Sequence, residues 1–403
     1  MPTTKTIAII GAGIAGCATA FALAKRGFRV NIFEKNASIA SEASGNPSGL
    51  LYPRLSGDAH ASAFALTAYL YSLPFYRALN LPPPTLNFSG LLQLGFNARE
   101  RARIQKVASW LSPDIAKIVD ATLTTQLSGI DCPHEALFFP QAAWLQPQAI
   151  CAALIQHKNI SVFTLNNIDN ILNNNNLFEI YSDKNLISEA DIIVVANAAQ
   201  AQYFAPCAHL ETIKIRGQLT QLGASETSQH LKMPICTDGY LIPANDDVHT
   251  LGATFSFESH IEVAEADHQE NLDKLKPISE HLYQSLKNQA RDGRVAFRCT
   301  SKDHFPLVGQ LLDANTLQSQ PPRPSAAKHT LPWLQNLYVN IGHGSHGFCS
   351  APLAAEMIAA QIAKENLPIA HHIAAKLNPN RFLLKKMGLK KLANTVAYDW
   401  LEE

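Results

Sequence analysis

The chain has 403 residues and carries 33 basic and 33 acidic side chains, so its formal net charge is zero. This balance gives no overall field that would attract nucleic acid, and any such contact must come from a local patch. A hydrophobic content of 47% excludes disorder, and apolar runs such as 192–196 are too short to span a membrane. Seven cysteines without a CxxC pair indicate reduced thiols, so we expect a cytoplasmic protein.

The segment 5–34 has the most informative pattern. An apolar run over 7–10 enters Gly-Ala-Gly-Ile-Ala-Gly at 11–16, an Ala-rich helix candidate follows, and a β-prone run over 30–33 ends in Glu34. Strand, glycine turn, helix, strand and acid in this order predict a βαβ unit that binds a dinucleotide. The motif alone does not choose between NAD and FAD, but its place near the start of the chain favours FAD.

Each residue type in this unit has a physical reason. Gly11 permits a tight turn, Gly13 lets the backbone approach a pyrophosphate, and Gly16 lets the helix pack close to the strand. The helix N-terminus offers free N–H groups to the phosphates, and Glu34 accepts hydrogen bonds from a ribose while disfavouring a phosphorylated ribose. The residues expected to contact the cofactor here are Gly11, Gly13, Ile14, Ala15, Gly16, Glu34 and Lys35.

The middle of the chain supplies further strands. An Asn-rich segment over 166–176 is predicted to be a hairpin tip between strands at 161–165 and 177–181. The run DIIVVANAA at 191–199 is continuous and apolar, which is typical of a buried parallel strand, and its end at Ala196 is expected to face the cofactor.

Alternating patterns over 240–243, 251–255 and 294–298 predict an antiparallel sheet in a second domain, covered by helices within 61–80 and 266–290. We therefore predict an α/β protein whose second domain is α+β.

The C-terminal third contains a second strand–turn–helix unit. The segment 312–331 is rich in Pro, Ser and Gln and is predicted to be an exposed loop. A strand at 337–341 then runs into the glycine turn 342–347 and an Ala-rich helix, with Ser350 as the expected N-cap. The predicted cofactor domain is therefore discontinuous. The expected boundaries are 1–60, 150–215 and 335–370 for the cofactor domain, 61–149 and 216–334 for the substrate domain, and 371–403 for a basic tail.

Five blocks of the sequence resemble the glycine/D-amino-acid oxidase superfamily in order and spacing. They are GAGIAG…FEK, ASGNPSGLLYP (43–53), DGYLIPA (238–244), FRCTSKDHFPLVG (297–309) and GHGSHGFCSAPLAAE (342–356). The ASGN and APLAAE blocks resemble one branch, the FAD-dependent oxidoreductase half of the bifunctional enzymes that make 5-methylaminomethyl-2-thiouridine in tRNA. The resemblance covers nearly the whole chain. It implies a glutathione reductase-like FAD-binding Rossmann domain and an antiparallel-sheet substrate domain of the D-amino-acid oxidase type.

Two departures from this branch are visible. The bifunctional enzymes carry a methyltransferase domain ahead of the oxidase, whereas this sequence has none, so we expect a stand-alone oxidase, and a separate methyltransferase is a candidate partner. The branch typically has arginine at the position of His346, which leaves open how the edge of the flavin is held.

The resemblance implies oxidation of a secondary amine with FAD as the hydride acceptor. The substrate would be a 5-carboxymethylaminomethyl uridine, with or without 2-thiolation, at the wobble position of tRNA. Loss of the carboxymethyl group as glyoxylate would leave an aminomethyl uridine, and dioxygen would accept the electrons as hydrogen peroxide.

Three residues are expected at the reacting centre. Arg298 has a planar guanidinium that can grip the substrate carboxylate with two hydrogen bonds, and the alternative is a structural arginine paired with an acid such as Asp303. Tyr240 begins a strand, and the resemblance implies that it lies at the same carboxylate; the alternative is an aromatic residue of the sheet. His346 precedes a helix N-terminus that can stabilise negative charge on the flavin ring, or else is a surface polar residue.

Small residues let backbone N–H groups reach the oxygens of a flavin. The further expected cofactor contacts are Ser44, Gly45, Asn46, Ser48, Gly49, Leu50, Ala196, Gly344, Ser345, His346 and Gly347. Cys299 lies beside Arg298 and invites the idea of a covalent flavin link, but free cysteines are usually buried small hydrophobes, so none is expected. The histidines form no HxH or HxxxH pair, and no metal is predicted.

Basic residues gather in the segment RFLLKKMGLKK at 381–391. Apolar residues lie among them, so the segment is either a phosphate-binding patch or an amphipathic helix that docks by its apolar side. With the family resemblance, we expect tRNA to contact Arg381, Lys385, Lys386, Lys390 and Lys391.

Two other functions stay open. An oxidase of free glycine, sarcosine or a small D-amino acid would share the superfamily motifs and Arg298. A flavoprotein that binds tRNA without turnover would keep affinity for the RNA and lose flavin reduction. A nicotinamide-dependent dehydrogenase is disfavoured because the sequence contains only one complete dinucleotide fingerprint.

Overall fold

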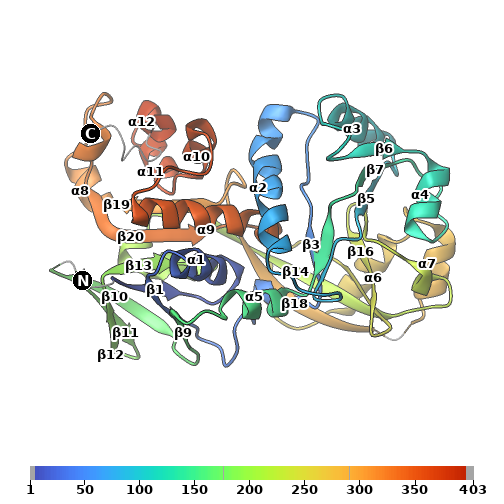
Figure 1. Ribbon diagram of the computed structural model, residues 1–403, viewed down its shortest axis with the longest axis horizontal. Coiled ribbons are helices and arrows are strands. Elements are labelled where there is room, and N and C mark those ends of the chain that lie inside the picture. The colour runs from blue at the N-terminus through green and yellow to red at the C-terminus, as the bar shows by residue number, and fades with distance from the viewer. Residues whose placement is uncertain (1–4, 176, 290, 396–403) are drawn as a thin grey trace. The chain divides into compact units, whose positions relative to one another are not determined.

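The computed structural model describes residues 5–175, 177–289 and 291–395. The chain divides into two compact units (Figure 1). Unit 1 comprises residues 1–45, 151–214 and 298–403, and unit 2 comprises residues 46–150 and 215–297. These boundaries differ from the expected ones, since the third segment of unit 1 begins at 298 and the C-terminal tail belongs to unit 1. Residues 396–403 of the predicted tail lie outside the described residues.

Unit 1 contains a six-stranded sheet with the strand order β19-β20-β13-β1-β2-β9. Its strands are β1 (Thr6–Ile10), β2 (Arg29–Phe33), β9 (Ile160–Phe163), β13 (Ile192–Val195), β19 (Leu307–Leu312) and β20 (Trp333–Ile341). Every neighbouring pair is parallel except β19 with β20. The central strands are continuous runs of Ile, Val and Ala because helices and loops cover both faces of a parallel sheet. The strands predicted near 7–10, 191–199 and 337–341 are confirmed.

The antiparallel strand β19 explains why unit 1 begins at 298. Val308 pairs with Asn340 and Leu307 with Ile341, so this strand extends the sheet of unit 1 rather than a second domain. The segment 312–331 was expected to be a loop, and this is wrong in part. Asp313 accepts hydrogen bonds from the N–H groups of Asn315 and Thr316 and caps a short helix there, α8 (Ala314–Ser319).

Two longer helices of unit 1, α1 (Ile14–Ala24) and α9 (Gly347–Ala363), pack against each other beside the sheet (Figure 1). Their many alanines allow this close packing. The expected N-cap of α9 at Ser350 is wrong, because the helix begins at Gly347 and His346 is its N-cap. The Ser350 hydroxyl instead donates to the carbonyl of His346 at 3.0 Å. The remaining helical elements are α10 (His371–Leu377), α11 (Arg381–Lys386), α12 (Lys390–Thr395), η1 (Ala43–Gly45), η2 (Ala198–Tyr203), η3 (Ala205–Cys207) and η5 (Lys328–Thr330).

The Asn-rich segment is not a hairpin tip. It forms the strand β10 (Ile168–Asn174), which pairs with β11 (Leu177–Ser182), and β11 in turn pairs with β12 (Asn185–Ala190). The expected partner at 161–165 instead contributes β9 to the large sheet. The prediction failed because Ile168 and Ile171 bury one face of β10, while its asparagines face solvent.

Unit 2 contains an antiparallel-rich sheet of eight strands with the order β18-β14-β17-β16-β15-β5-β7-β6. The strands are β5 (Leu91–Leu94), β6 (Lys117–Val119), β7 (Ala136–Phe139), β14 (Thr212–Gly223), β15 (Ile235–Cys236), β16 (Tyr240–Asn245), β17 (Val248–Gly252) and β18 (Arg291–Ser301). A smaller sheet has the order β3-β8-β4, with β3 (Gly49–Leu51), β4 (Leu86–Asn87) and β8 (Ala143–Leu145). The predicted antiparallel sheet is confirmed. The chain crosses between the units within β14 and β18.

Several helices complete unit 2. They are α2 (Ala59–Arg77), α3 (Ala98–Ala108), α4 (Ala121–Ser128), η4 (Ser228–His230), α6 (Glu265–Asp273) and α7 (Glu280–Leu286), and α5 (Pro147–Leu154) lies at the boundary with unit 1. The side chain of Asp58 caps α2, and Ser279 caps α7. Helices were predicted in both of these regions, although Ala290 lies outside the described residues.

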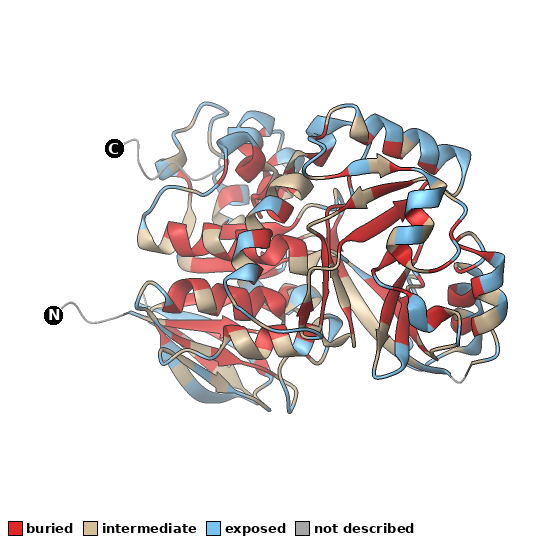
Figure 2. Ribbon diagram, turned by 45° about the vertical axis from the view of Figure 1, so that its right-hand side comes forward, coloured by how far each residue is buried: buried red, intermediate tan, exposed pale blue. Residues whose placement is uncertain are grey.

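Each unit has its own apolar core. Figure 2 shows buried strands in both units and largely buried α1 and α9. The C-terminal helices are held by a separate cluster that contains Leu312, Leu317, Leu384 and Leu392, so the tail docks on the end of β19. Within the described ranges, no helix is both long enough and apolar enough to cross a bilayer.

Candidate functional site

Three loops meet at one edge of the unit 1 sheet. The strands β1, β13 and β20 are parallel neighbours, with Ile10 paired to Val195 and Val195 paired to Val339. Their carboxyl ends therefore lie together, and the chain leaves them at 11–16, at 196–197 and at 342–347. Ligands of parallel α/β sheets bind at this edge. The glycine turn and Ala196, which were singled out from the sequence, thus lie at the same edge of the sheet.

Two of the glycines in this edge are required by close backbone contacts. Gly11 has a φ of +104°, and a Cβ atom there would lie 2.8 Å from the carbonyl oxygen of Ala196. A Cβ atom on Gly16 would lie 1.9 Å from the carbonyl oxygen of Gly11, which is impossible without moving the helix. The two glycines therefore bring α1 and β13 closer to the first turn than any other residue would permit.

The first turn is held by one serine and one acid. The N–H of Ile14 donates to Ser44 Oγ at 3.0 Å, so the predicted contact Ser44 lies at the N-terminus of α1. Glu34, at the end of β2, is 6% exposed and accepts a 2.9 Å hydrogen bond from the N–H of Ala12. Its second oxygen accepts from the backbone and side-chain N–H groups of Asn36. The acid is thereby fixed beside the glycine turn.

The helices α1 and α9 present their N-termini side by side. A Cβ atom on Gly347 would lie 3.2 Å from Ile14 Cγ2, so the two first turns touch. At the opposite end, Arg26 pairs with Glu356 at 2.5 Å and with Glu365 at 2.7 Å. The two helices are therefore parallel, and their positive dipole ends converge on the same edge of the sheet. Such an edge suits an anionic ligand, which a pyrophosphate would be.

A buried polar chain links these two helices through the sheet. Asn340 on β20 donates to Thr19 Oγ1 at 3.0 Å, and its Oδ1 lies 2.9 Å from His343 Nε2. His343 Nδ1 lies 2.8 Å from Ser350 Oγ. Burial lowers the pKa of His343 to about 4, so its ring is neutral at physiological pH. These contacts with Asn340 and Ser350 fix the glycine turn between β20 and α9.

The predicted residue Arg298 lies on β18 directly beside this turn. Its neighbour Cys299 accepts a 2.7 Å hydrogen bond from the N–H of Gly344, and Thr300 forms a bridge with His343. Burial raises the pKa of Cys299 to about 11, so the thiol is protonated at neutral pH and is not an activated nucleophile. Asp303, the acid considered as a structural partner of Arg298, pairs with Arg381 at 2.6 Å.

His346 and Ser345 occupy the start of α9. His346 is the N-cap residue, and its carbonyl accepts from the N–H groups of Cys349 and Ser350 at 3.0 Å each. Ser345 is exposed, whereas Gly344 and Gly347 are half-buried. The predicted cofactor residues at 344–347 therefore surround a helix N-terminus, as the strand–turn–helix pattern indicated.

Other predicted residues belong to unit 2. Asn46 accepts a 2.7 Å hydrogen bond from Arg294, which ties the start of this unit to β18. Gly49 and Leu50 lie on β3, paired with Leu145 and Trp144 of β8. Ser48 is buried, and Gly45, which ends η1, closes the first segment of unit 1.

Tyr240 begins β16 opposite Gly252 and packs against the cluster that contains Cys236. A Cβ atom on Gly252 would lie 2.4 Å from Leu219 Cδ2 and 3.4 Å from the Tyr240 hydroxyl oxygen, so the glycine makes room for the leucine, and the tyrosine ring lies in contact distance. Tyr240 belongs to unit 2, whereas Arg298 belongs to unit 1. Lys35, the remaining predicted contact, pairs with Glu42 at 2.9 Å in unit 1.

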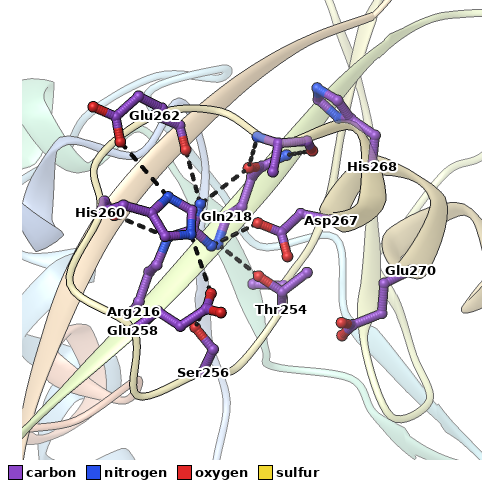
Figure 3. Close-up of polar contacts among 12 residues, drawn as sticks. Arg216, Gln218, Thr254, Ser256, Glu258, His260, Glu262, Asp267, His268 and Glu270 are labelled. Atoms are coloured by element: carbon purple, nitrogen blue, oxygen red, sulfur yellow. Dashed lines mark hydrogen bonds and ion pairs between the residues drawn. The ribbon is translucent and has the colours of Figure 1, made fainter.

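Arg216 on β14 lies in a closed network of polar contacts, a role that the sequence analysis did not find (Figure 3). Its side chain is fully buried, pairs with Asp267 at 2.5 Å and donates to the carbonyls of His260 and Glu262. The side-chain amide of Gln218 accepts a hydrogen bond from the N–H of Ala264 and donates one to its carbonyl. This arginine therefore organises a loop within unit 2.

The basic tail requires one correction. Arg381 was expected to contact tRNA, but its side chain is 1% exposed and is enclosed by hydrogen-bond acceptors. Lys385, Lys386, Lys390 and Lys391 are exposed, while Leu383, Leu384 and Leu392 between them are buried. The segment is thus an amphipathic helix pair with lysines on its outer side. In the described part of the chain, no group of three or more His, Cys, Asp or Glu side chains is arranged to hold a metal ion.

The edge of the unit 1 sheet fits the dinucleotide part of FAD. The glycine turn leaves no room for side chains where phosphates would bind, and the Glu34 carboxylate ends the strand that carries the ribose acceptor in such sites. The buried Oδ1 of Asn197, which follows Ala196, has no hydrogen-bond partner among the described residues. A bound ligand at this edge could supply one.

Curated relatives show a strong similarity over nearly the whole chain. The chain is 42% identical over 393 residues to the tRNA 5-methylaminomethyl-2-thiouridine biosynthesis bifunctional protein MnmC of Methylobacillus flagellatus, covering 96% of this chain and 61% of that protein. For the protein of the same name from Stutzerimonas stutzeri, the identity is 37% over 392 residues, covering 94% and 59%. The chain therefore spans about three fifths of the length of these relatives.

Solved structures show the same fold. Glycine oxidase from Geobacillus kaustophilus superposes with a TM-score of 0.75 at 18% identity, covering 93% of this chain and 98% of that one. L-proline dehydrogenase from P. horikoshii gives a TM-score of 0.74 at 18% identity, covering 96% and 99%. Residues 6–361 match the DAO family, described as FAD dependent oxidoreductase. Because this match covers most of the chain and includes the glycine turns that hold the cofactor edge, the chain belongs to the family of DAO-type FAD-dependent oxidoreductases.

Proposed function

We propose that this protein removes the carboxymethyl group from 5-carboxymethylaminomethyl uridine, with or without 2-thiolation, at the wobble position of tRNA. The observation that carries the proposal is the 42% identity, over 96% of this chain, to a bifunctional protein of tRNA 5-methylaminomethyl-2-thiouridine biosynthesis. The match extends through both units, so it includes the substrate-side strands as well as the dinucleotide motif.

The proposed reaction balances as an amine oxidation. The methylene carbon of the carboxymethylamine loses a hydride and the amine loses a proton, water adds to the resulting imine, and the C–N bond breaks. Glyoxylate leaves, and the aminomethyl uridine stays in the tRNA. FAD, when bound, accepts the hydride and passes two electrons to dioxygen, which is released as hydrogen peroxide.

The residues of this chain hold the reactants. Arg298 binds the substrate carboxylate through its planar guanidinium and thereby orients the methylene group. Its strand is tied to the 342–347 turn by the Cys299–Gly344 hydrogen bond, and this supports a carboxylate site next to the proposed cofactor turn. Tyr240 is proposed as a second contact of the carboxylate. The paired N-termini of α1 and α9 stabilise negative charge on the cofactor, and His346 caps one of them.

The outer lysines of the C-terminal helices are proposed to contact the tRNA backbone. Lys385 and Lys386 end α11, and Lys390 and Lys391 begin α12, so the four ammonium groups lie on adjacent short helices. A chain without net charge gains affinity for RNA from such a local patch. A separate methyltransferase that acts on the exposed amine product is the partner that this reaction calls for.

The test is anaerobic reduction of the bound flavin, followed by its visible absorbance. One cuvette contains tRNA that carries the carboxymethylaminomethyl uridine, and a second contains millimolar glycine or sarcosine. We expect rapid bleaching with the tRNA, release of glyoxylate, and no bleaching with unmodified tRNA. Bleaching by the free amino acid alone would instead establish an amino-acid oxidase. Tight tRNA binding without bleaching would establish a non-catalytic tRNA-binding flavoprotein.

A charge variant tests the proposed tRNA contact separately. The quadruple variant Lys385→Gln, Lys386→Gln, Lys390→Gln and Lys391→Gln should raise the Kd for tRNA and flatten its dependence on salt, because fewer counterions are released. The control, Lys364→Gln together with Lys376→Gln, removes two charges elsewhere in the C-terminal region. An equal effect per removed charge in the two sets would remove the patch from the proposal.

A further inference from the structure

Arg381 is one of the two largest fully buried side chains in the described part of the chain, and nearly all of its bonds go to one turn. Its Nε and Nη2 atoms bind the two oxygens of Asp303 at 2.9 and 2.6 Å. Further N–H groups donate to the carbonyls of Phe305 at 2.8 Å and Pro306 at 3.2 Å, and to Ser301 Oγ at 3.1 Å. A residue near the C-terminus thus holds the turn 301–306.

The turn 301–306 adjoins both Arg298 and the glycine turn 342–347. It follows Arg298 at the end of β18 and precedes β19. A Cβ atom on Gly342 would lie 3.6 Å from the N atom of Leu307, 3.7 Å from Pro306 Cα and 3.8 Å from Ser301 N. The turn therefore packs directly on the first residue of the glycine turn 342–347, while the strand before it bonds to Gly344.

The turn also has a backbone that needs external support. His304 adopts a φ of +62°, in the left-handed region that residues with a Cβ atom rarely occupy. Ser301 Oγ lies 2.8 Å from Asp303 Oδ1, and the N–H of Phe305 donates to the same oxygen at 3.2 Å. Asp303 therefore gathers the turn around its carboxylate, and Arg381 neutralises and immobilises that carboxylate. Backbone conformations of this kind persist when their surroundings over-determine them.

We propose that Arg381 and Asp303 form a positioning pair that sets the placement of Arg298 relative to the 342–347 turn. The inference rests on the proposed function in one respect, namely that Arg298 binds the carboxylate of the substrate. Arg381 touches neither substrate nor cofactor, and it acts through the turn 301–306. The C-terminal segment is thereby part of the reaction geometry, although it lies beyond residue 361, where the match to the family ends.

A neighbouring residue supplies a matched control. Asn380 docks the same segment, but onto the strand instead of the turn. Its Nδ2 donates to the carbonyl of Gln310 at 2.9 Å, and its Oδ1 accepts from the N–H of Leu312 at 2.9 Å. Asn380→Ala should therefore loosen the C-terminal helices and leave the turn intact. A purely structural role for Arg381 predicts that Arg381→Met and Asn380→Ala behave alike.

The experiment titrates the FAD-loaded protein with glycolate, a small carboxylate, and follows the perturbation of the flavin absorbance spectrum. We expect Arg381→Met and Asp303→Asn each to raise the Kd for glycolate by about tenfold or more, because a misplaced arginine loses its bidentate grip. Arg381→Lys should recover part of this loss, since it keeps the charge but not the fork of donors. Asn380→Ala should change the Kd by less than about twofold. The melting temperature of each variant is measured in parallel.

The outcomes separate this inference from the proposed function. A lowered melting temperature with an unchanged glycolate Kd in both Arg381→Met and Asp303→Asn would overturn the positioning role. Wild-type protein that does not respond to glycolate would also overturn it, because Arg298 would then have no carboxylate to bind. If the wild type binds glycolate as expected but modified tRNA does not bleach the flavin, the proposed substrate fails and the positioning pair stands. Asp303→Asn changes little volume, so the test holds even if Arg381→Met does not fold.

Discussion

The two buried arginines, Arg216 in unit 2 and Arg381 in unit 1, use the same chemistry at different places. Each pairs with one aspartate and donates to backbone carbonyls of a single loop. Arg216 reaches its loop from the middle of a strand, so the loop is fixed by the sheet of its own unit. Arg381 reaches its turn from a short C-terminal helix, so that turn is held by a side chain from outside the sheet.

The loops also differ in what they present. The loop held by Arg216 carries Phe255 and Phe257, which are 59% and 73% exposed and meet edge to face at 5.7 Å between ring centroids. The turn held by Arg381 instead packs against Gly342, at the edge of the unit 1 sheet where the parallel strands end. The comparison teaches that a buried arginine can organise either an exposed loop or a turn that supports the site, and that only the surroundings decide which.

The largest expected effect is that of Arg216→Met. It leaves Asp267 unpaired and the carbonyls of His260 and Glu262 without their donor, which should cost about 3–5 kcal/mol. Amide hydrogen exchange resolved along the chain should show the lost protection in unit 2. Protection that is lost equally in unit 1 would mean that the arginine does not act locally.

The corresponding change in unit 1, Arg381→Met, should cost less, about 2 kcal/mol, because the side chain of Asp303 is 33% exposed and can rehydrate. In this case the lost protection should appear in the turn 301–306 and in β19. A greater loss than that of Arg216→Met would show that the docking of the tail, and not the exposure of the partner acid, controls the energy.

A double-mutant cycle sharpens the comparison further. Combining Arg381→Met with Asp303→Asn removes both charges, so the double variant should be more stable than the sum of the single effects predicts, by about 1 kcal/mol. The same cycle with Arg216 and Asp267 should give a greater coupling energy, because that pair is more deeply buried. Equal coupling energies in the two cycles would contradict this ordering.

The smallest expected effect concerns pH. Burial by itself raises the pKa of Asp303, but the hydrogen bonds from Arg381, from Ser301 and from the N–H of Phe305 outweigh it and leave the pKa below its ordinary value. A lowered pKa in the folded state means that the stabilisation is complete above the unfolded value, about 3.9, and is lost as the pH falls through the folded value. Stability curves of the wild type and Asp303→Asn should therefore converge below about pH 4. Curves that stay parallel would contradict the charged pair.

Much of the dinucleotide edge was predictable because its determinants are local. The order strand, glycine turn, helix and acid predicted the close packing at Gly11 and Gly16 and the place of Glu34 at the end of β2, since these residues act on neighbours within one βαβ unit. The second turn at 342–347 was found in the same way. The Asn-rich segment was mispredicted as a hairpin tip. Only two of the residues of β10, Ile168 and Ile171, are buried, and the exposed asparagines between and after them obscured the strand pattern.

The roles of the charged side chains were decided by tertiary structure. The sequence by itself determined that basic residues cluster at 381–391 and that they alternate with apolar ones. It did not show which cation would be buried, because that depends on an acid 78 positions away, Asp303, which the sheet brings to Arg381. In the same way, the antiparallel strand β19 was assigned to the wrong domain because its partner β20 follows only after an intervening helix and loop. Local periodicity determines secondary structure, but long-range burial determines which charges form ion pairs and which remain available to a ligand.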